Sequence, residues 1–322
     1  MAQLGLGMAS LGRPGYINLG HGEDLKHDHS IESVRNNAFE VLNQAWDSGI
    51  RHFDVARSYG RAEEFVSQWV REGAISPREI DISSKWGYTY TAAWKVQTPK
   101  DVAHEVKRHE LPVLKRQYST SLNHLGEHLK LYQIHSATEE SGVLSNQAVL
   151  QFLDRIRQTG TSIGLSVSGP RQSETIEKAL SVKLNGERLF QSVQATWNLL
   201  ERSSELALKN AHDLGLKVII KESLANGRLT NRNQNPGFRS RKDQLSQLAQ
   251  QYSTTIDAIS IAAALNQPWA GLVLIGATTT EQVVSNVAAT TLYWSEELEK
   301  RTSNIAESST DYWNSRAKLA WN

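Results

Sequence analysis

Three short apolar stretches of the chain end at residues that can donate, accept or hold a proton. These residues stand at, or just after, the carboxyl end of each stretch and are, in chain order, Asp54, Tyr59, Lys85 and His135. The carboxyl ends of neighbouring parallel strands lie at one edge of a sheet, so the four side chains are expected to converge. A carboxylate, a phenol, an ammonium group and an imidazole are the groups that general acid–base chemistry uses.

Segments with strand and helix patterns alternate along most of the chain. Strands are expected over 51–55, 80–85, 129–135, 161–169, 190–194, 216–221 and 271–275, and the glycine-rich stretch 4–12 is either a first strand or a segment that closes the bottom of a barrel. Apolar residues at helical spacing predict helices over 30–48, 62–72, 100–126, 143–158, 171–184, 204–214, 242–252, 255–265, 280–289 and 297–322. In the helix over 100–126, Pro112 predicts a break. The alternation predicts an α/β fold, a (β/α)8 TIM barrel in one domain spanning residues 1–322.

An open, doubly wound sheet is the alternative arrangement of the same units. Such a sheet would carry a glycine-rich dinucleotide fingerprint after its first strand. The segment 5–10 reads GLGMAS and lacks the third glycine at the required spacing. The barrel is therefore the favoured prediction.

The composition limits the kinds of partner and compartment. The chain has 322 residues and a formal charge of +1, with Lys and Arg spread along the sequence, so nucleic acid is not an expected partner. There is no run of about 20 apolar residues that could form a membrane helix. The N-terminus lacks the basic head and apolar core of a signal peptide, so the cytoplasm is expected. Zero cysteines exclude disulfides and thiolate metal ligands.

The four proton-handling residues resemble the catalytic tetrad of the aldo-keto reductase superfamily, which is Asp, Tyr, Lys and His in this order. The family's Ser-Leu-x-x-Leu-Gly helix end has a counterpart in residues 121–126, shortly before His135. The resemblance covers most of the chain and implies reduction of an aldehyde or ketone, or the reverse reaction, with a nicotinamide cofactor. By this resemblance Tyr59 is the general acid, Lys85 favours its phenolate form, Asp54 orients Lys85 and His135 hydrogen-bonds the carbonyl oxygen.

The resemblance also assigns residues to the nicotinamide end of the cofactor. The family holds the nicotinamide amide with a Ser-Asn pair and a Gln, which match Ser166, Val167 and Gln194, so Val167 departs from the pattern. Further along, the family commonly stacks an aromatic residue on the nicotinamide, and this chain has Lys221-Glu222 there. The stacking partner is therefore absent or comes from elsewhere.

Two later segments resemble the sites for the rest of the cofactor. The segment 223–229 is similar to the loop around the pyrophosphate, where backbone amides and a close glycine suit an anion. The segment 275–286 resembles the site for adenosine and its 2'-phosphate, but has no Lys or Arg. We therefore expect NADP with modest discrimination and keep NAD as the alternative. The implied contacts are Ser223, Leu224, Gly227, Gly276, Ala277, Thr278, Gln282 and Asn286.

Two other functions remain open from the sequence. The first is a cofactor-binding regulatory or non-catalytic protein with the same fold. The second is a barrel lyase or aldolase that uses Lys85 as a Schiff base. The partner expected of an enzyme is a small-molecule carbonyl compound, whose identity the sequence does not give, and the oligomeric state is equally open. The His-rich segment 15–30 is expected to be a solvated loop, and we predict no metal site.

Overall fold

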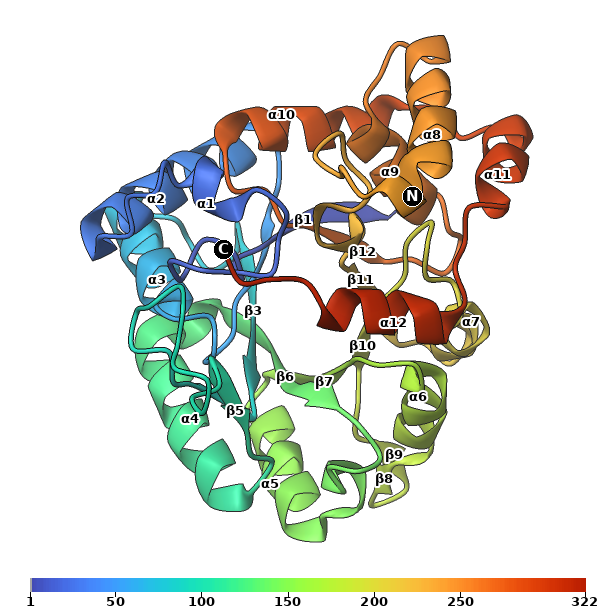
Figure 1. The fold of residues 1–322 in the computed structure, drawn as a ribbon. Helices are drawn as coiled ribbons and strands as arrows, with labels where there is room; N and C mark the ends of the chain where they lie inside the picture. Colours follow the sequence, from blue (N-terminus) through green and yellow to red (C-terminus); the bar gives the residue numbers. More distant parts are fainter. Residues whose placement is uncertain (1) are drawn as a thin grey trace.

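Eight parallel strands form the closed barrel that Figure 1 shows. The computed structural model describes residues 2–322, and the strands follow one another around the ring in the order β1-β12-β11-β10-β7-β6-β3-β2. Their bounds are β1 Gln3–Gly7, β2 His52–Asp54, β3 Asp81–Trp86, β6 Leu129–Ala137, β7 Ser162–Val167, β10 Ser192–Thr196, β11 Lys217–Lys221 and β12 Leu272–Ile275. Parallel pairing brings all their carboxyl ends to one end of the barrel. The predicted (β/α)8 TIM barrel is confirmed.

Helices connect the strands and surround the ring (Figure 1). They are α1 His21–Asp24, α2 Ile31–Asp47, α3 Ala62–Glu72, α4 Leu111–Leu125, α5 Gln147–Gln158, α6 Gln172–Ser181, α7 Glu205–Asp213, α8 Arg239–Gln251, α9 Ile256–Leu265, α10 Thr280–Val287, α11 Glu296–Ser303 and α12 Ser309–Ala317. Polar side chains fix several helix starts. Thr279, for example, accepts a hydrogen bond from the Gln282 backbone N–H at 3.3 Å and begins α10 beside the barrel mouth.

The prediction of one helix over 100–126 is wrong in its first part. Residues Glu105–Lys107 form strand β5, which pairs antiparallel with β4, Tyr88–Tyr90. A second small pair, β8 Lys183–Leu184 and β9 Glu187–Arg188, lies after α6. Pro112 stands in the first turn of α4, where its missing N–H would have no helical partner. Pro112 therefore begins this helix and does not break it.

The predictions for the two ends of the chain also need correction. The helix predicted over 297–322 is divided into α11 and α12, and the tail after α12 crosses the mouth of the barrel (Figure 1). The segment 15–30 is not simply a solvated loop, since it contains α1 and buries His21. The Tyr16 N–H donates to the Asn322 carbonyl oxygen at 3.1 Å, and the Asn322 N–H donates to the Tyr16 carbonyl oxygen at 3.2 Å. The loop is ordered by the far end of the chain.

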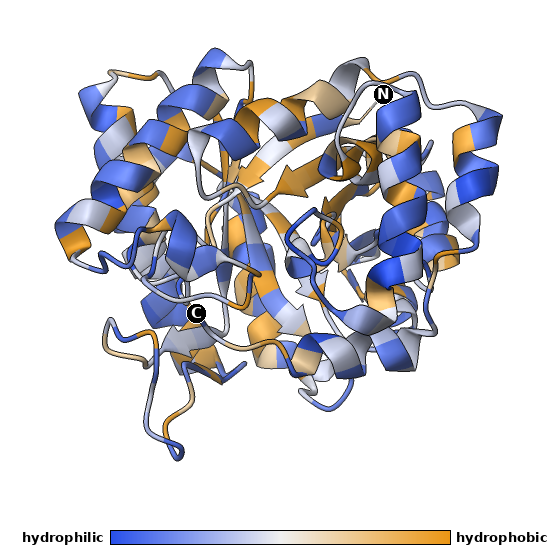
Figure 2. Cartoon of the chain, turned by 45° about the horizontal axis from the view of Figure 1, so that its top comes forward, coloured by the Kyte–Doolittle hydropathy of each residue, from blue (hydrophilic) through white to orange (hydrophobic). Residues whose placement is uncertain are grey.

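An apolar layer inside the barrel separates the polar side chains at its carboxyl end from those at its amino end. Figure 2 shows the apolar strands inside a shell of helices with polar outer faces. Within the ring, Leu131, Ile219, Leu272 and Leu274 form a small apolar cluster separate from the main core. Alternate residues of a strand share a face, so the next inward position of β11 after Ile219 is Lys221. Polar side chains lie at both ends of the barrel, since His52, Asp81 and Lys217 stand at the amino end, but the four convergent residues lie at the carboxyl end.

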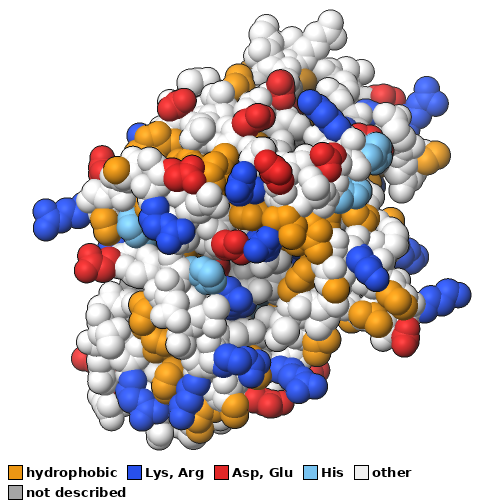
Figure 3. Space-filling view, turned by 90° about the vertical axis from the view of Figure 1, so that its left-hand side faces the viewer, with side chains coloured by type: hydrophobic (Ala, Val, Ile, Leu, Met, Phe, Trp, Pro, Cys, Tyr) orange, Lys and Arg blue, Asp and Glu red, His pale blue; other side chains and the backbone are white. Residues whose placement is uncertain are grey.

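The outer surface mixes charges of both signs. On the face in Figure 3, Lys and Arg side chains are interspersed with Asp and Glu. This face has no large patch of one sign of the kind that nucleic-acid binding requires. Across residues 2–322, we find no helix with the length and apolar character that a membrane span needs.

Candidate active site

Asp54 and Lys85 form a buried ion pair at the carboxyl ends of β2 and β3. One Asp54 carboxylate oxygen contacts Lys85 Nζ. The other accepts hydrogen bonds from Ser83 at 2.6 Å, Gln133 at 3.3 Å and Gln194 at 3.1 Å. These donors come from three different strands, so the barrel itself fixes the carboxylate and, through it, the lysine.

Tyr59 stands on the turn after β2 and directs its hydroxyl toward Lys85. The distance from Lys85 Nζ to the Tyr59 hydroxyl oxygen is 3.3 Å, and the ammonium group lies 4.7 Å from the centre of the ring. The turn packs tightly on Gly12, where an added Cβ would lie 2.1 Å from the Tyr59 carbonyl oxygen. Only glycine at position 12 permits this approach, which sets the position of the tyrosine.

His135 faces the same point from β6. Its ring packs edge-on against the Tyr59 ring, with centroids 5.5 Å apart and an interplanar angle of 84°. Ser58 Oγ lies 3.4 Å from His135 Nδ1. Burial lowers the pKa of His135 well below its usual value, and the cations Lys85 and Lys221 lower it further. The imidazole is therefore neutral near pH 7 and carries one N–H donor.

The Tyr59 hydroxyl holds its proton in this structure. Burial raises its pKa well above the usual value and Asp54 raises it further, whereas Arg13 lowers it. Burial also lowers the pKa of Lys85, against the attraction of Asp54. The predicted influence of Lys85 on the Tyr59 pKa is outweighed, because the lysine charge is matched by Asp54 and the phenol is deeply buried.

A single long cavity of about 860 Å³ starts at this group and crosses the carboxyl end of the barrel. Asp54, Tyr59 and His135 line it, and Lys85 lies behind them. Eight of the ten residues predicted to contact a cofactor also line this cavity. They are Gln194, Ser223, Leu224, Gly227, Gly276, Ala277, Gln282 and Asn286.

The other two predicted residues, Ser166 and Thr278, are buried behind the cavity wall. Ser166 Oγ accepts a hydrogen bond from the Ser136 N–H at 2.8 Å, and it is Ser168 that lines the cavity. The Thr278 N–H donates to Gln282 Oε1 at 2.8 Å. Both residues support their neighbours on the wall and do not face the cavity.

The loop after β11 turns sharply beside the cavity. Positive φ angles occur at Glu222 (56°), Ala225 (49°), Asn226 (56°) and Gly227 (86°). Non-glycine residues adopt this conformation at an energetic cost, so the loop needs contacts that hold it. Asn226 Oδ1 in this loop and Asn286 Oδ1 on α10 are buried and have no hydrogen-bond partner among residues 2–322. A bound polar ligand would satisfy such oxygens.

A guanidinium group reaches the far end of the cavity from outside the predicted segment 275–286. Arg232 pairs with Asp24 at 2.8 Å and donates to the Gly20 carbonyl oxygen at 3.0 Å. Gln282 Nε2 donates to the same carboxylate at 2.9 Å, and the Arg232, Asp24 and Gln282 side chains all line the cavity. Sequence reasoning missed Arg232 because only the fold brings its loop to α1 and α10.

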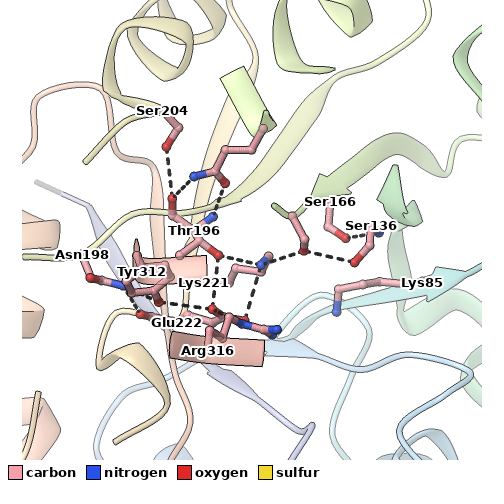
Figure 4. A network of polar contacts seen from close by, with 12 residues as sticks. Lys85, Ser136, Ser166, Thr196, Asn198, Ser204, Lys221, Glu222, Tyr312 and Arg316 are labelled. Carbon is pink, nitrogen blue, oxygen red and sulfur yellow. Dashed lines mark hydrogen bonds and ion pairs between the residues drawn. The ribbon is translucent and has the colours of Figure 1, made fainter. Parts of the chain in front are cut away.

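A second charged group lies at the end of β11 (Figure 4). Lys221 Nζ donates to Thr196 Oγ1 at 2.7 Å and to Ser168 Oγ at 3.2 Å. The Glu222 carboxylate accepts from Nε of Arg316, on α12, at 2.9 and 3.0 Å, and from its Nη2. Burial opposes ionisation of Glu222, but Arg316 and Lys221 still hold its pKa at about 2. These side chains replace the aromatic residue that the resemblance implied.

Arg13 and the C-terminal tail complete the wall beside Tyr59. The Arg13 side chain is buried and donates to Glu105 at 3.1 Å. Its guanidinium lies 4.9 Å from the ring centres of both Tyr16 and Trp321. These residues come from distant parts of the chain, and no local pattern in the sequence identifies them.

Comparisons with known proteins identify the family. The sequence profile described as the aldo/keto reductase family matches residues 3–305. A Schizosaccharomyces pombe protein provisionally named an aryl-alcohol dehydrogenase is 24% identical over 293 residues, which cover 80% of this chain and 88% of that protein. The L-glyceraldehyde 3-phosphate reductase of Escherichia coli O157:H7 is 24% identical over 331 residues, covering 92% of this chain and 90% of that protein.

A solved structure supports the fold independently. The holo form of the aldo-keto reductase AKR11C1 from Bacillus halodurans superposes with a TM-score of 0.68 at 18% sequence identity, over 95% of this chain and 92% of that chain. The family match extends from β1 to the residues after α11, so it includes all four residues that meet at the end of the cavity. The chain belongs to the aldo/keto reductase family of carbonyl oxidoreductases, which use a nicotinamide cofactor.

Proposed function

We propose that this protein reduces an aldehyde or ketone to an alcohol, or catalyses the reverse reaction, with NADPH as hydride donor and Tyr59 as general acid or base. The observation that carries the proposal is the approach of Lys85 Nζ to the Tyr59 hydroxyl, at 3.3 Å, with His135 against the same ring in a deep cavity. A small carbonyl compound is the proposed substrate. The complete tetrad favours an enzyme over a non-catalytic, cofactor-binding protein.

Reduction adds a hydride to the carbonyl carbon and a proton to the carbonyl oxygen. The nicotinamide cofactor supplies the hydride when it is bound. Tyr59 donates its hydroxyl proton to the oxygen, and neutral His135 donates a hydrogen bond to the same atom. Lys85, oriented by Asp54, then stabilises the phenolate that Tyr59 becomes. The lysine charge therefore acts after proton transfer begins, which is compatible with a protonated Tyr59 beforehand.

The environment of Lys85 disfavours a Schiff-base lyase or aldolase. Its side chain has no exposed surface, and Nζ contacts Asp54 and donates to the Val55 carbonyl oxygen at 3.1 Å. It also donates to Tyr59. A buried ammonium group whose hydrogens are all bonded to neighbouring residues cannot reach a substrate carbonyl or act as a nucleophile.

NADP is the proposed cofactor, with NAD as the alternative. Gln194 near the tetrad and the unpartnered oxygens of Asn226 and Asn286 fit a long polar molecule that follows the cavity. Arg232 supports a 2'-phosphate, because guanidinium groups bind phosphate strongly. Asp24 already pairs with that guanidinium, however, so we expect the preference for NADPH to be modest.

The proposal is tested by following NADPH oxidation with a panel of sugars, pyridoxal-like aldehydes, aromatic aldehydes and glyceraldehyde 3-phosphate. We expect turnover of at least one of them by the wild type and a large loss in Tyr59→Phe, which lacks only the phenolic oxygen. Cofactor binding without any turnover would favour the regulatory alternative. Undiminished turnover by Tyr59→Phe would contradict the assignment of the acid.

A further inference from the structure

Lys221 faces the cavity from the inward side of β11. Side chains two residues apart on a strand share a face, so Lys217, Ile219 and Lys221 form one row. Ile219 belongs to the apolar cluster inside the barrel, and Lys217 lies at the opposite end from the tetrad. Lys221 lines the main cavity, and Figure 4 shows it beside Glu222 and Arg316 with Lys85 nearby.

The position of Lys221 lies along the path that a cofactor must take. The cavity wall contains His135 and Ser168 near the tetrad, then Lys221, then Ser223 and Leu224 in the loop after β11. A nicotinamide cofactor with its reactive ring at the tetrad and its phosphates along this loop therefore passes Lys221. Strand β10 also ends between these two parts of the wall, but Thr196 at its end is buried behind Lys221 and accepts a hydrogen bond from it, so Lys221 is the charged side chain on this stretch of the path.

The charge of Lys221 is only partly matched by its surroundings. Its hydrogen-bond acceptors are the hydroxyls of Thr196 and Ser168. The Glu222 carboxylate lies 3.7 Å away and is already bound by two nitrogens of Arg316. Lys221 thus differs from a lysine held in a closed ion pair, because part of its charge remains available to a ligand in the cavity.

Other titratable groups also face Lys221. Arg316 approaches from α12, Lys85 from β3 and His135 from β6, and the last of these is neutral. Burial lowers the pKa of Lys221 to about 8, with Arg316 and Lys85 lowering it and Glu222 opposing the change. Lys221 is therefore mostly cationic at pH 7 and loses its charge within an experimentally accessible range.

We propose that Lys221 contacts the nicotinamide end of the cofactor and makes the protein bind the reduced cofactor more tightly than the oxidised cofactor. This inference rests on the proposed function. The oxidised nicotinamide ring carries a positive charge and the reduced ring does not, so a neighbouring ammonium group penalises only the oxidised form. Because the Lys221 side chain is only 15% exposed, the penalty corresponds to at least about tenfold in affinity. The oxidised cofactor then dissociates more readily than the reduced cofactor.

Fluorescence titration tests this inference without measuring turnover. NADPH and NADP⁺ are titrated against the wild type, Lys221→Met, Lys221→Arg and Lys217→Met, and quenching of tryptophan emission gives each Kd. We expect the wild type to bind NADPH at least about tenfold more tightly than NADP⁺. Lys221→Met should narrow that ratio several-fold, chiefly by tightening NADP⁺, whereas Lys221→Arg should keep it. Lys217→Met removes the same charge from the same row, but at the far end, and should keep the wild-type ratio.

The pH gives a second readout. Between about pH 6.5 and about pH 9.5 the wild-type ratio should fall as Lys221 loses its proton, whereas Lys221→Arg, which stays charged, should hold its ratio. If Lys221→Met does not fold, the comparison of wild type with Lys221→Arg decides.

The outcomes separate this inference from the proposed function. Equal ratios in the wild type and Lys221→Met, with both cofactors bound, would overturn the role of Lys221 alone. A wild-type ratio of the NADP⁺ and NADPH dissociation constants that does not change with pH would also overturn the role of Lys221. Failure of the wild type to bind either cofactor would overturn the proposed function itself.

Discussion

Lys85 and Lys221 end two strands of the same barrel at the same end, but their surroundings differ. Lys85 is wholly buried, and its charge is matched by an Asp54 carboxylate that three strands hold in place. The Lys221 side chain is 15% exposed and hydrogen-bonds to two hydroxyls. A lysine paired with its own carboxylate, such as Lys85, serves to fix the geometry of the site. A lysine whose charge is only partly neutralised, such as Lys221, can still distinguish ligands by their charge.

The carboxylates beside the two lysines, Asp54 and Glu222, are also held by different parts of the chain. Asp54 is held from inside the barrel, by β3, β6 and β10. Glu222 is held from outside it, by Arg316 on α12, and Asn198 Nδ2 donates to its carbonyl oxygen at 2.9 Å. The Asp54–Lys85 pair should therefore depend on the barrel strands, and the ion pair beside Lys221 should depend on how α12 packs.

Removing the Tyr59 hydroxyl should give the largest effect on chemistry and little effect on structure. Tyr59→Phe is expected to lower kcat by roughly 10²- to 10⁴-fold, a barrier increase of about 3 to 5 kcal/mol, because the proton donor is lost. Cofactor affinity should barely change. Steady-state NADPH oxidation and fluorescence titration measure the two quantities. Near-normal turnover would make His135 the leading candidate for the acid.

Lys85→Met should reduce turnover by a similar factor, but with a cost in stability that Tyr59→Phe does not have. It leaves the Asp54 carboxylate buried without its cation, a change that typically costs about 3 to 5 kcal/mol. Denaturant unfolding measures this cost, with Tyr59→Phe as the control that keeps the ion pair. The losses in kcat should not add in the double variant, because both residues serve one proton transfer. Additive losses would show two independent roles.

The tetrad could be predicted from the sequence because its signals are local. Asp54, Lys85 and His135 lie near the carboxyl ends of their strands and Tyr59 stands on the turn after β2, and parallel pairing brings strand ends together whatever the details of the helices. Asp54, Lys85 and His135 needed only the correct strand positions. The barrel itself followed from the same alternation of strand and helix.

The rest of the site depends on packing between distant segments. Arg316 reaches Glu222 only because α12 lies across the barrel, and Arg13 lies against Trp321 because the tail returns to the mouth. Ser168 lines the cavity wall where Ser166 was predicted to lie, because of a local change in strand pairing. The pairing of β6 with β7 shifts register after Ile134, and Ser136 takes a positive φ of 51°. No sequence pattern announces such a shift.

Glu222→Gln should affect stability more than chemistry, in contrast to Tyr59→Phe. Arg316 would lose its anionic partner, which is expected to cost about 1 to 3 kcal/mol because the pair is only partly exposed. Thermal unfolding measures the change. Glu187→Gln is the matched control, since that carboxylate pairs with Arg157 but is 70% exposed, and its loss should cost less than about 0.5 kcal/mol.

The same carboxylate predicts a pH dependence with a defined sign. The pKa of Glu222 is about 2 in the folded protein, below its unfolded value, so the contribution to stability is complete above about pH 4.5. It is lost as the pH falls from there toward 2. Glu222→Gln should therefore destabilise the protein at neutral pH and matter progressively less on acidification. An equal destabilisation at all pH values would contradict the low pKa.

The smallest expected effect lies at the other end of the cavity and completes the comparison. Lys221 is proposed to distinguish oxidised from reduced rings, whereas Arg232 is proposed to distinguish cofactors with and without a 2'-phosphate. Arg232→Gln should weaken NADPH binding by about 3- to 10-fold and leave NADH binding nearly unchanged, a limited effect because Asp24 already shares the guanidinium. Asp24→Asn should act in the opposite direction, since it frees that charge for the phosphate. Titration of NADPH and NADH against both variants measures these affinities. An equal change in the affinities for NADPH and NADH would mean that Arg232 only holds its loop against α1 and does not contact a 2'-phosphate.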